Sequence, residues 1–495
     1  MILKKYVTKD NYKMYMLIIV VILLILPTLL RYIMMGKIVL ADDQAYQDLS
    51  ISDMLRDKDI SFTESIHDLL IVPSRPIITT PYHLLIGHLG NFFRTELITI
   101  FLMIMLGVIS LLLFEKILSR FEIPYFQRFI IIIFLALSPL FLYNFLIPTQ
   151  THFIIFLQLL GFYLYSNKDI RYLRYLSIIP YILLPFFGIV HTMIAIIIFV
   201  SYDILENKTY LFYLIPLSML MIIISLYFSF PIYYKYGFIK TSIISGNLFQ
   251  YYITDFGSKQ GFSIFGVILM IFGLIKTWKE KYTKNYLWIY IFLIFLLILS
   301  FFYSRYEGYL NFVVMIFAGI GFLYLFEIKW EMKIIKRFTI LIIILGLLFS
   351  GVSFIKRISA SNPSQEMIES LDWLRHESSK NSEESVILSH PEYSHIVKYY
   401  TRKKVFIDSN QNYIGDYPYF IKVLDTIYQS RSLKEVIPIL ERYDIRFILI
   451  TQEMKEGLVW DKDEQGLLFL LENSDRFKQL YSKHGIEIWK FNKIT

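Results

Sequence analysis

The sequence of 495 residues contains no cysteine, which excludes disulfides, thiolate metal sites and cysteine nucleophiles. Charged residues are scarce as well, at 18% of the chain, whereas a soluble domain carries about 25%. This scarcity excludes an ordinary soluble enzyme, and the 56% of hydrophobic residues excludes a disordered protein. The chain instead has long charge-free runs rich in Phe and Tyr, which predict a polytopic α-helical membrane protein.

The charge-free runs predict the membrane spans. They cover residues 14–30, 97–114, 129–167, 175–202, 209–234, 260–275, 285–304, 308–326 and 338–355. A helix needs about 20 residues to cross the hydrocarbon core. The run 129–167 is too long for one helix, and Pro148-Thr149-Gln150 predicts a hairpin between two. The run 175–202 is either one tilted helix or two short helices that turn near Gly188.

The positions of the basic residues predict the orientation in the cell membrane. Residues 356–495 hold 20 basic and 21 acidic side chains, so the net charge of +8 originates in the membrane part. Basic residues between apolar runs mark cytoplasmic loops. The positive charge therefore indicates membrane orientation, and we expect no nucleic acid partner. A cytoplasmic N-terminus and about eleven spans, with 175–202 crossing the membrane twice, place most of the basic residues on the cytoplasmic side. The C-terminal domain then lies outside the cytoplasm.

This topology places two large segments outside the cytoplasm, namely residues 41–96 and residues 356–495. The membrane module, residues 1–355, carries an outer loop at 41–96 that holds 9 acidic and 4 basic residues. The spacing of apolar residues from Tyr46 to Leu55 predicts a short helix on the membrane surface in this loop.

Residues 356–495 alternate helix and strand signals. Strands are predicted at 385–388, 405–407, 446–450 and 486–489, with Asn362 as the N-cap of the first helix. This pattern predicts an extracytoplasmic α/β domain with a largely parallel sheet. Neither GxGxxG nor GxxxxGK[ST] occurs, so nothing supports a nucleotide site.

The densest acidic feature is Asp42-Asp43, directly after the first predicted span. Two carboxylates at the edge of a low-dielectric region suit a general base and a ligand for substrate or a divalent cation. The alternative interpretation is a pair of solvated carboxylates that ends a span. No HExxH or similar spacing occurs, so any metal ion would depend on Asp42 and Asp43 alone.

The stretch Asp42-Asp43-Gln44-Ala45-Tyr46, followed by prolines at 73, 76 and 81, resembles the GT-C superfamily of membrane glycosyltransferases. This superfamily includes protein O-mannosyltransferases, the aminoarabinose transferase of lipid A and oligosaccharyltransferase catalytic subunits. The resemblance implies that Asp42 is the catalytic carboxylate and Asp43 its acidic partner. It also implies a polyisoprenyl-phosphate sugar as donor, and a protein, lipid or glycan as acceptor, in a chain surrounded by membrane lipids.

Further candidates follow from the resemblance. Arg305, in Tyr303-Ser304-Arg305-Tyr306-Glu307, and Arg75 are candidates for binding the donor phosphate, because a guanidinium contacts two phosphate oxygens at once. The alternative for Arg305 is an arginine that snorkels at the end of a span. Tyr46, His67 and His83 are candidates for acceptor or donor contacts, and the alternative for each histidine is a polar interface residue.

The leading hypothesis is an inverting glycosyltransferase in which Asp42 deprotonates an acceptor hydroxyl at the outer face. Where oligosaccharyltransferases carry Trp-Trp-Asp-x-Gly for acceptor peptides, this chain has His390-Pro391-Glu392-Tyr393-Ser394, which speaks against recognition of a peptide sequon. A transporter or flippase for a lipid-linked sugar is one alternative, although the predicted spans lack the charges that transport paths carry. A non-catalytic member of the fold is another.

Overall fold

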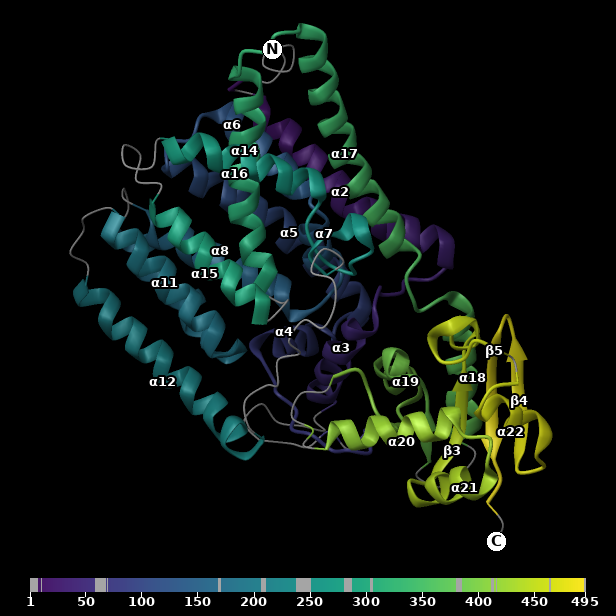
Figure 1. Cartoon of the computed structure of the whole chain (residues 1–495). Helices are drawn as coiled ribbons and strands as arrows, with labels where there is room; N and C mark the ends of the chain where they lie inside the picture. Colours follow the sequence, from purple (N-terminus) through teal and green to yellow (C-terminus); the bar gives the residue numbers. More distant parts are fainter. Residues whose placement is uncertain are drawn as a thin grey trace. The chain divides into compact units, whose positions relative to one another are not determined.

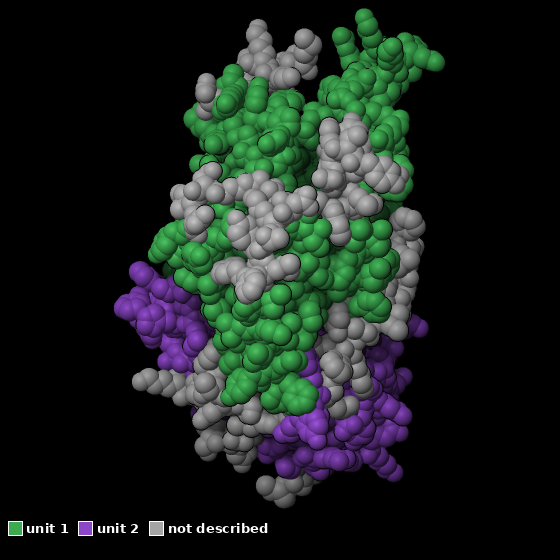
Figure 2. All heavy atoms as spheres, turned by 90° about the vertical axis from the view of Figure 1, so that its left-hand side faces the viewer, with its two compact units in different colours: residues 1–33, 97–231, 240–360 green, residues 34–96, 232–239, 361–495 purple. Residues whose placement is uncertain are grey.

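The computed structural model describes residues 8–9, 11–57, 68, 70–167, 171–205, 211–236, 251–279, 287–302, 306–379, 385–410, 414, 416–462 and 464–493. The chain forms two compact units, which Figure 2 colours separately. Unit 1 comprises Met1–Ile33, Leu97–Pro231 and Lys240–Ala360, and unit 2 comprises Met34–Glu96, Ile232–Ile239 and Ser361–Thr495. The outer loop therefore folds in the same unit as the C-terminal residues.

Unit 1 is helical (Figure 1). Its elements are α2 (Tyr12–Met35), α5 (Thr95–Arg120), α6 (Tyr125–Leu137), α7 (Pro139–Leu146), α8 (Gln150–Tyr165), α9 (Arg171–Leu176), α10 (Ile178–Leu183), η1 (Leu184–Phe187), α11 (Ile189–Leu205), α12 (Leu211–Tyr236), η2 (Thr254–Phe256), α14 (Ile264–Lys279), α15 (Leu287–Phe302), α16 (Glu307–Glu327) and α17 (Lys333–Ser359).

The helices of unit 1 confirm a multi-pass membrane protein. Among the described residues, five helices are long and apolar enough to cross a membrane, namely α2, α5, α12, α16 and α17, and the bent pair α6–α7 makes a sixth if it is one span. Three shorter apolar stretches lie at Tyr172–Phe187, Ile189–Ile204 and Ile289–Phe302. The number of about eleven spans and their orientation remain predictions.

The helices in the long apolar runs end where proline lacks a backbone N–H or where glycine adopts a positive φ. The break predicted at 148–150 is confirmed, because α7 ends at Leu146 and α8 begins at Gln150. A second break was not predicted: α6 and α7 meet at 62° before Pro139, whose ring lacks an N–H. The run 175–202 forms separate helices that meet at Gly188, which has a φ of 120°.

The helices extend beyond the charge-free runs from which they were predicted. Consequently α2 contains Arg31, α5 contains Glu115 and α16 begins at Glu307. All three side chains are buried, and the interpretation that the spans lack charge is therefore wrong at their ends.

Small residues let α14 and α16 approach closely. A Cβ atom at Gly273 would lie 2.0 Å from the backbone oxygen of Phe317, and one at Gly321 would lie 2.0 Å from that of Leu269. Such backbone contact is the usual way for membrane helices to associate, since lipid gives them no hydrophobic driving force.

Unit 2 combines helices with one sheet. Its elements are α3 (Asp43–Arg56), α4 (Pro81–Leu89), α18 (Gln365–Ser379), β1 (Val386–Leu388), η4 (Pro391–Tyr393), α19 (Ser394–Thr401), β2 (Lys404–Val405), α20 (Tyr417–Gln429), α21 (Leu433–Arg442), β3 (Ile445–Ile450), η5 (Met454–Leu458), α22 (Leu467–Asn473), β4 (Phe477–Lys483) and β5 (Ile486–Phe491). The α/β class is confirmed, and the predicted helix from Tyr46 to Leu55 is α3.

The sheet is mixed, with strand order β2-β1-β3-β5-β4. Strand β1 is parallel to β2 and β3, whereas β5 is antiparallel to β3 and β4. The prediction of a largely parallel sheet is therefore wrong. The reason is an unpredicted hairpin: β4 is mostly exposed and turns into β5 through His484 and Gly485, whose φ angles of 51° and 74° suit a tight hairpin turn.

Two local details of unit 2 differ from the prediction. The N-cap of α18 is Ser364, whose hydroxyl accepts the Met367 N–H, while the Asn362 amide donates to Glu453. Strand β2 ends at Val405, earlier than predicted, and there Ile71 of the outer loop pairs in parallel with Val405. The Val405 N–H donates to Leu70 O at 2.9 Å, so the outer loop extends this edge of the sheet.

Candidate active site

Asp42 lies at the start of α3 with a backbone conformation that few residues other than glycine adopt. Its φ is 74° and its ψ is 141°, a conformation that costs on the order of 1–3 kcal/mol and persists only where the surroundings enforce it. Asp42 Oδ1 accepts the Gln44 N–H at 3.1 Å, and the Asp42 N–H donates to Asn362 O at 3.0 Å. The carboxylate therefore caps α3 and is fixed by a backbone contact to residue 362, far along the chain.

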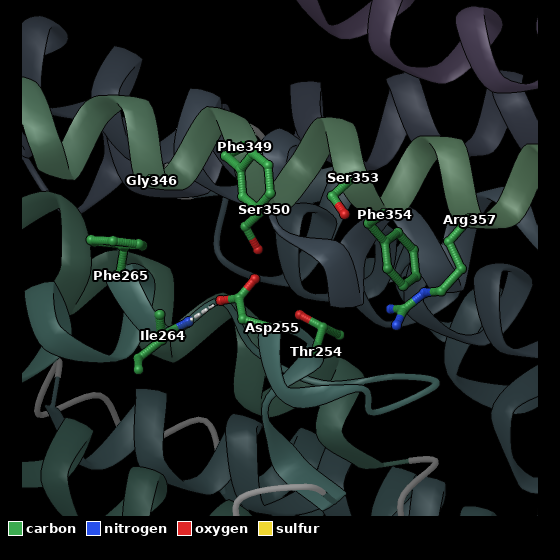
Figure 3. Close-up of a pocket in the computed structure, with 10 residues that line it drawn as sticks. All are labelled: Thr254, Asp255, Ile264, Phe265, Gly346, Phe349, Ser350, Ser353, Phe354 and Arg357. Carbon is green, nitrogen blue, oxygen red and sulfur yellow. Dashed lines mark hydrogen bonds between the residues drawn. The ribbon is translucent and has the colours of Figure 1, made fainter.

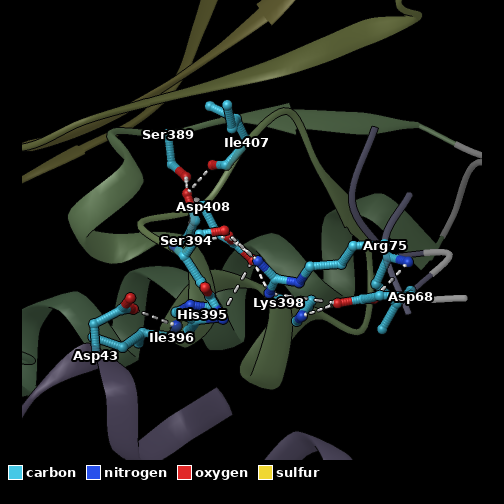
Figure 4. Close-up of polar contacts among 12 residues, drawn as sticks. Asp43, Asp68, Arg75, Ser389, Ser394, His395, Ile396, Lys398, Ile407 and Asp408 are labelled. Atoms are coloured by element: carbon cyan, nitrogen blue, oxygen red, sulfur yellow. Dashed lines mark hydrogen bonds and ion pairs between the residues drawn. The ribbon is translucent and has the colours of Figure 1, made fainter. Parts of the chain in front are cut away.

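Asp43 links α3 to α19. Its Oδ1 accepts the backbone N–H of Ile396 at 2.9 Å (Figure 4). Ile396 lies in the first turn of α19, where the helix dipole favours a negative charge. Asp43 is only 8% exposed, so a segment more than 350 residues away orients this carboxylate.

Tyr46 is fully buried one turn further along α3. Its ring centre lies 5.3 Å from that of Tyr399 and 5.7 Å from that of Tyr400, both in α19. Its hydroxyl donates to Leu40 O at 3.4 Å. Burial raises the pKa of Tyr400 to about 12, so this aromatic contact stays uncharged at neutral pH. The geometry gives Tyr46 a packing role between α3 and α19.

His83 connects α4 to α3 and is 1% exposed. The Thr80 N–H donates to Nδ1 at 3.1 Å, and Nε2 lies 3.1 Å from Asp48 Oδ1. Because an N–H can only donate, we infer that Nδ1 is the acceptor and that Nε2 carries the proton toward Asp48. The predicted site residues His67 and Arg305 lie outside the described residues.

A buried ion-pair network, formed by Asp68, Arg75, Lys398 and Asp408, joins the outer loop to α19 and to the end of β2 (Figure 4). Arg75 donates from both Nη atoms to the two oxygens of Asp408, at 2.7 and 2.6 Å, and from Nη1 to Asn410 O at 2.6 Å. Lys398 Nζ donates to Asp68 Oδ2 at 2.7 Å. The two cations balance the two carboxylates.

The surroundings of the network set its protonation. Burial alone would raise the pKa of the Asp408 carboxyl, but His395, Arg75 and Lys398 outweigh it and lower that pKa below its usual value. His395 Nδ1 lies 3.6 Å from Asp408 Oδ2, and burial lowers the pKa of this histidine to about 4. At neutral pH the ring is therefore uncharged and the network is electrically neutral.

These contacts revise the interpretation of Arg75. A side chain that is 4% exposed and binds Asp408 with both Nη atoms is committed to holding unit 2 together, which leaves little of it for a lipid phosphate. Sequence reasoning missed its partners Asp68, Lys398 and Asp408, and also His395. No local signal pairs residues 68–75 with 395–408, since the two stretches are more than 300 positions apart.

The described residues do not form a metal site on their own. Among them, no three His, Asp or Glu side chains converge in a way that could hold a metal ion. One oxygen of Asp42 and one of Asp43 each accept a backbone N–H. A divalent cation here would need water or substrate oxygens as further ligands.

No protein-family model and no curated protein matches the chain. Solved structures match it in fold. The apo oligosaccharyltransferase of Archaeoglobus fulgidus is similar with a TM-score of 0.62 and 12% identity, over 98% of this chain and 75% of that one. ArnT of Cupriavidus metallidurans is similar with a TM-score of 0.52 and 9% identity, over 95% of this chain and 97% of that one. The arabinofuranosyltransferase AftD from Mycobacteria gives a TM-score of 0.56 and 11% identity, over 95% of this chain and 41% of that one.

All three proteins are GT-C glycosyltransferases. The likeness covers almost the whole chain, and at these identities it is a likeness of fold. The resemblance that the Asp42-Asp43 motif indicated is thereby confirmed: the chain has the GT-C fold.

Proposed function

We propose that this chain is a membrane glycosyltransferase that moves a sugar from a polyisoprenyl-phosphate donor to an acceptor hydroxyl at the outer membrane face. The observation that carries the proposal is the GT-C fold over 95–98% of the chain. Two of the similar proteins have been solved with a polyisoprenyl phosphate bound. The Archaeoglobus enzyme has been seen with an inhibitory peptide and a dolichol-phosphate, and ArnT with undecaprenyl phosphate.

Asp42 is the proposed general base. Its carboxylate would accept the proton of the acceptor hydroxyl, whose oxygen forms the new bond to the anomeric carbon. The bond from that carbon to the lipid phosphate breaks, and the phosphate leaves with the electron pair. A single displacement of this kind inverts the anomeric carbon. The strained backbone at Asp42 supports the assignment, because such outliers concentrate at functional sites.

The other predicted residues take supporting roles in this proposal. Asp43, held by the Ile396 N–H, would orient Asp42 and the adjacent start of α3. Arg305 and His67 keep their proposed contacts to donor phosphate and substrate. Arg75, Tyr46 and His83 would act indirectly, by holding the outer loop in shape.

The test is Asp42→Asn, which keeps the shape of the side chain but removes the base. Transfer from a polyisoprenyl-phosphate sugar by the full chain in liposomes should fall at least about 100-fold, the low end of general-base contributions. Asp57→Asn, beyond the opposite end of α3, is the matched control and should stay near wild type. Wild-type transfer by Asp42→Asn would remove Asp42 from the reaction.

One observation favours the alternative of a transporter or flippase. Glu307, at the start of α16, is fully buried, and its carboxylate has no hydrogen-bond partner among the described residues. Ionisable groups inside membrane bundles often mark transport paths. The test is movement of a labelled lipid-linked sugar across the membrane of liposomes that contain the chain. Movement without sugar transfer to an acceptor, and its loss in Glu307→Gln, would support this alternative over the transferase.

A further inference from the structure

Unit 1 contains a cavity of about 210 Å³ that the proposed transfer reaction does not use. Its walls come from α14, α17 and the turn around η2 (Figure 3). Ser350, Ser353, Phe354 and Arg357 extend from α17 toward Thr254 and Asp255 on the opposite wall. The cavity therefore combines hydroxyls, aromatic rings and one charge of each sign.

Two polar groups of α17 at this cavity, in Ser350 and Arg357, form no hydrogen bond to the part of the chain that the structure describes. Ser350 is 3% exposed, and its hydroxyl has no hydrogen-bond partner among the described residues. A buried hydroxyl left in this way costs free energy until a ligand or water satisfies it. The Arg357 guanidinium is exposed and rests on the Phe354 ring at 4.9 Å, and no described residue accepts a hydrogen bond from it.

Asp255 supplies the opposite charge. Its Oδ2 accepts the Ile264 N–H at 2.7 Å, which fixes the carboxylate at the start of α14. Asp255 and Arg357 are close enough to interact electrostatically, yet they form no direct ion pair. Between them is room for a ligand that carries both charges itself.

The length of α17 supports a position of the cavity near the lipid headgroups. Helix α17 has 27 residues, so it is about 40 Å long and exceeds the roughly 30 Å hydrocarbon core. Arg357 is in its last turn, at the level of the interface. Toward the middle of the helix, Leu345, Phe349 and Val352 are 55%, 73% and 57% exposed, and so offer an apolar surface for acyl chains.

We propose that this cavity binds the headgroup of a zwitterionic phospholipid, with the phosphate at Arg357 and a primary ammonium between Asp255 and Ser350. The volume is below the roughly 300–1,000 Å³ of sites that enclose drug-sized ligands, so a headgroup fits while its acyl chains lie along α17. A purely anionic headgroup would meet Arg357 but would be repelled by Asp255. The inference does not depend on the proposed transferase activity.

The test is native mass spectrometry of the purified, delipidated full chain with added phosphatidylethanolamine, phosphatidylglycerol or a polyprenyl phosphate. One phosphatidylethanolamine should bind in preference to the other two lipids. Arg357→Ala should weaken it about tenfold, as expected for loss of a charge-assisted contact. Asp255→Asn should remove the preference over phosphatidylglycerol, and Ser350→Ala should weaken binding about two- to tenfold.

Lys356→Ala is the matched control, because Lys356 is the exposed neighbour of Arg357 on α17 and does not line the cavity. Equal binding by Arg357→Ala and Lys356→Ala would show that Arg357 only snorkels, and would overturn the proposal. Preferred binding of phosphatidylglycerol or polyprenyl phosphate, insensitive to Asp255→Asn, would overturn the zwitterionic headgroup. If Arg357→Ala does not fold, Ser350→Ala replaces it in the test. Wild-type phosphatidylethanolamine affinity in Ser350→Ala would then overturn the proposal.

Discussion

Removing one partner of the Arg75–Asp408 pair should destabilise unit 2 far more than removing both. Arg75→Met leaves the Asp408 carboxylate buried at 0% exposure without its bidentate partner, and Asp408→Leu strands the guanidinium in the same way. The double variant removes both charges and leaves Lys398 and Asp68 paired at 2.7 Å, so the network stays neutral.

The burial of the pair sets the size of the effect. Breaking a buried ion pair costs about 3–5 kcal/mol, whereas replacing both members with apolar side chains is often neutral. For a unit of about 200 residues, each kcal/mol shifts the melting temperature by about 2–4 °C, so each single variant should melt about 6–20 °C lower. The double variant should recover most of that loss, so its cost in stability should be far below the sum of the two single losses.

The assay is thermal unfolding of the full chain in detergent, followed by tryptophan fluorescence. Trp460 is fully buried in unit 2, where its Nε1 donates to Tyr428 O at 2.8 Å, so its share of the emission changes when this unit unfolds. Lys493→Met is the matched control. Its pair with Asp444 spans 3.7 Å between half-exposed side chains, and it should contribute less than about 1 kcal/mol.

Two results would refute the reasoning. Additive losses in the double variant would show that the two side chains do not stabilise each other. A melting temperature of Arg75→Met within about 2 °C of wild type, with transfer strongly reduced, would show that Arg75 acts on the donor phosphate as the sequence first indicated.

Three further predictions concern His395, Arg305 and the topology. Burial lowers the pKa of His395 from 6.5 to about 4. As the pH falls, His395 is therefore protonated in the unfolded chain at a higher pH than in the folded chain. Unit 2 should then lose about 3 kcal/mol as the pH falls from 6.5 to 4, and His395→Leu should flatten that slope in pH-dependent unfolding. If Arg305 binds the donor phosphate, Arg305→Lys should reduce transfer and Arg305→Ala should reduce it about 10- to 150-fold, whereas a silent lysine variant would indicate snorkelling. Labelling tags at positions 60 and 470 should react from outside and one at 280 from the cytoplasm, and external labelling at 280 would exclude the eleven-span topology.

The sequence by itself determined the parts of the protein that depend on local chemistry. Hydropathy and charge predicted the membrane helices, because each apolar run satisfies its own backbone inside the helix. Pro148 predicted the break before α8 for the same reason, since a missing N–H acts within a few residues. The break near Gly188 was one of two alternatives, and the placement of basic residues favoured it. The apolar spacing after Asp43 predicted α3, and the motif there indicated the GT-C fold.

The tertiary structure decided what depends on distant contacts. It assigned the outer loop to the same unit as the C-terminal residues, paired Arg75 with Asp408 across 333 positions and placed Asp43 on the first turn of α19. A buried charge is stable only beside its partner, and neither its partner nor its burial is written in the residues around it. The same holds for β4, whose exposed side chains carry little strand signal, and for the cavity beside Arg357, which exists only where α14 and α17 meet.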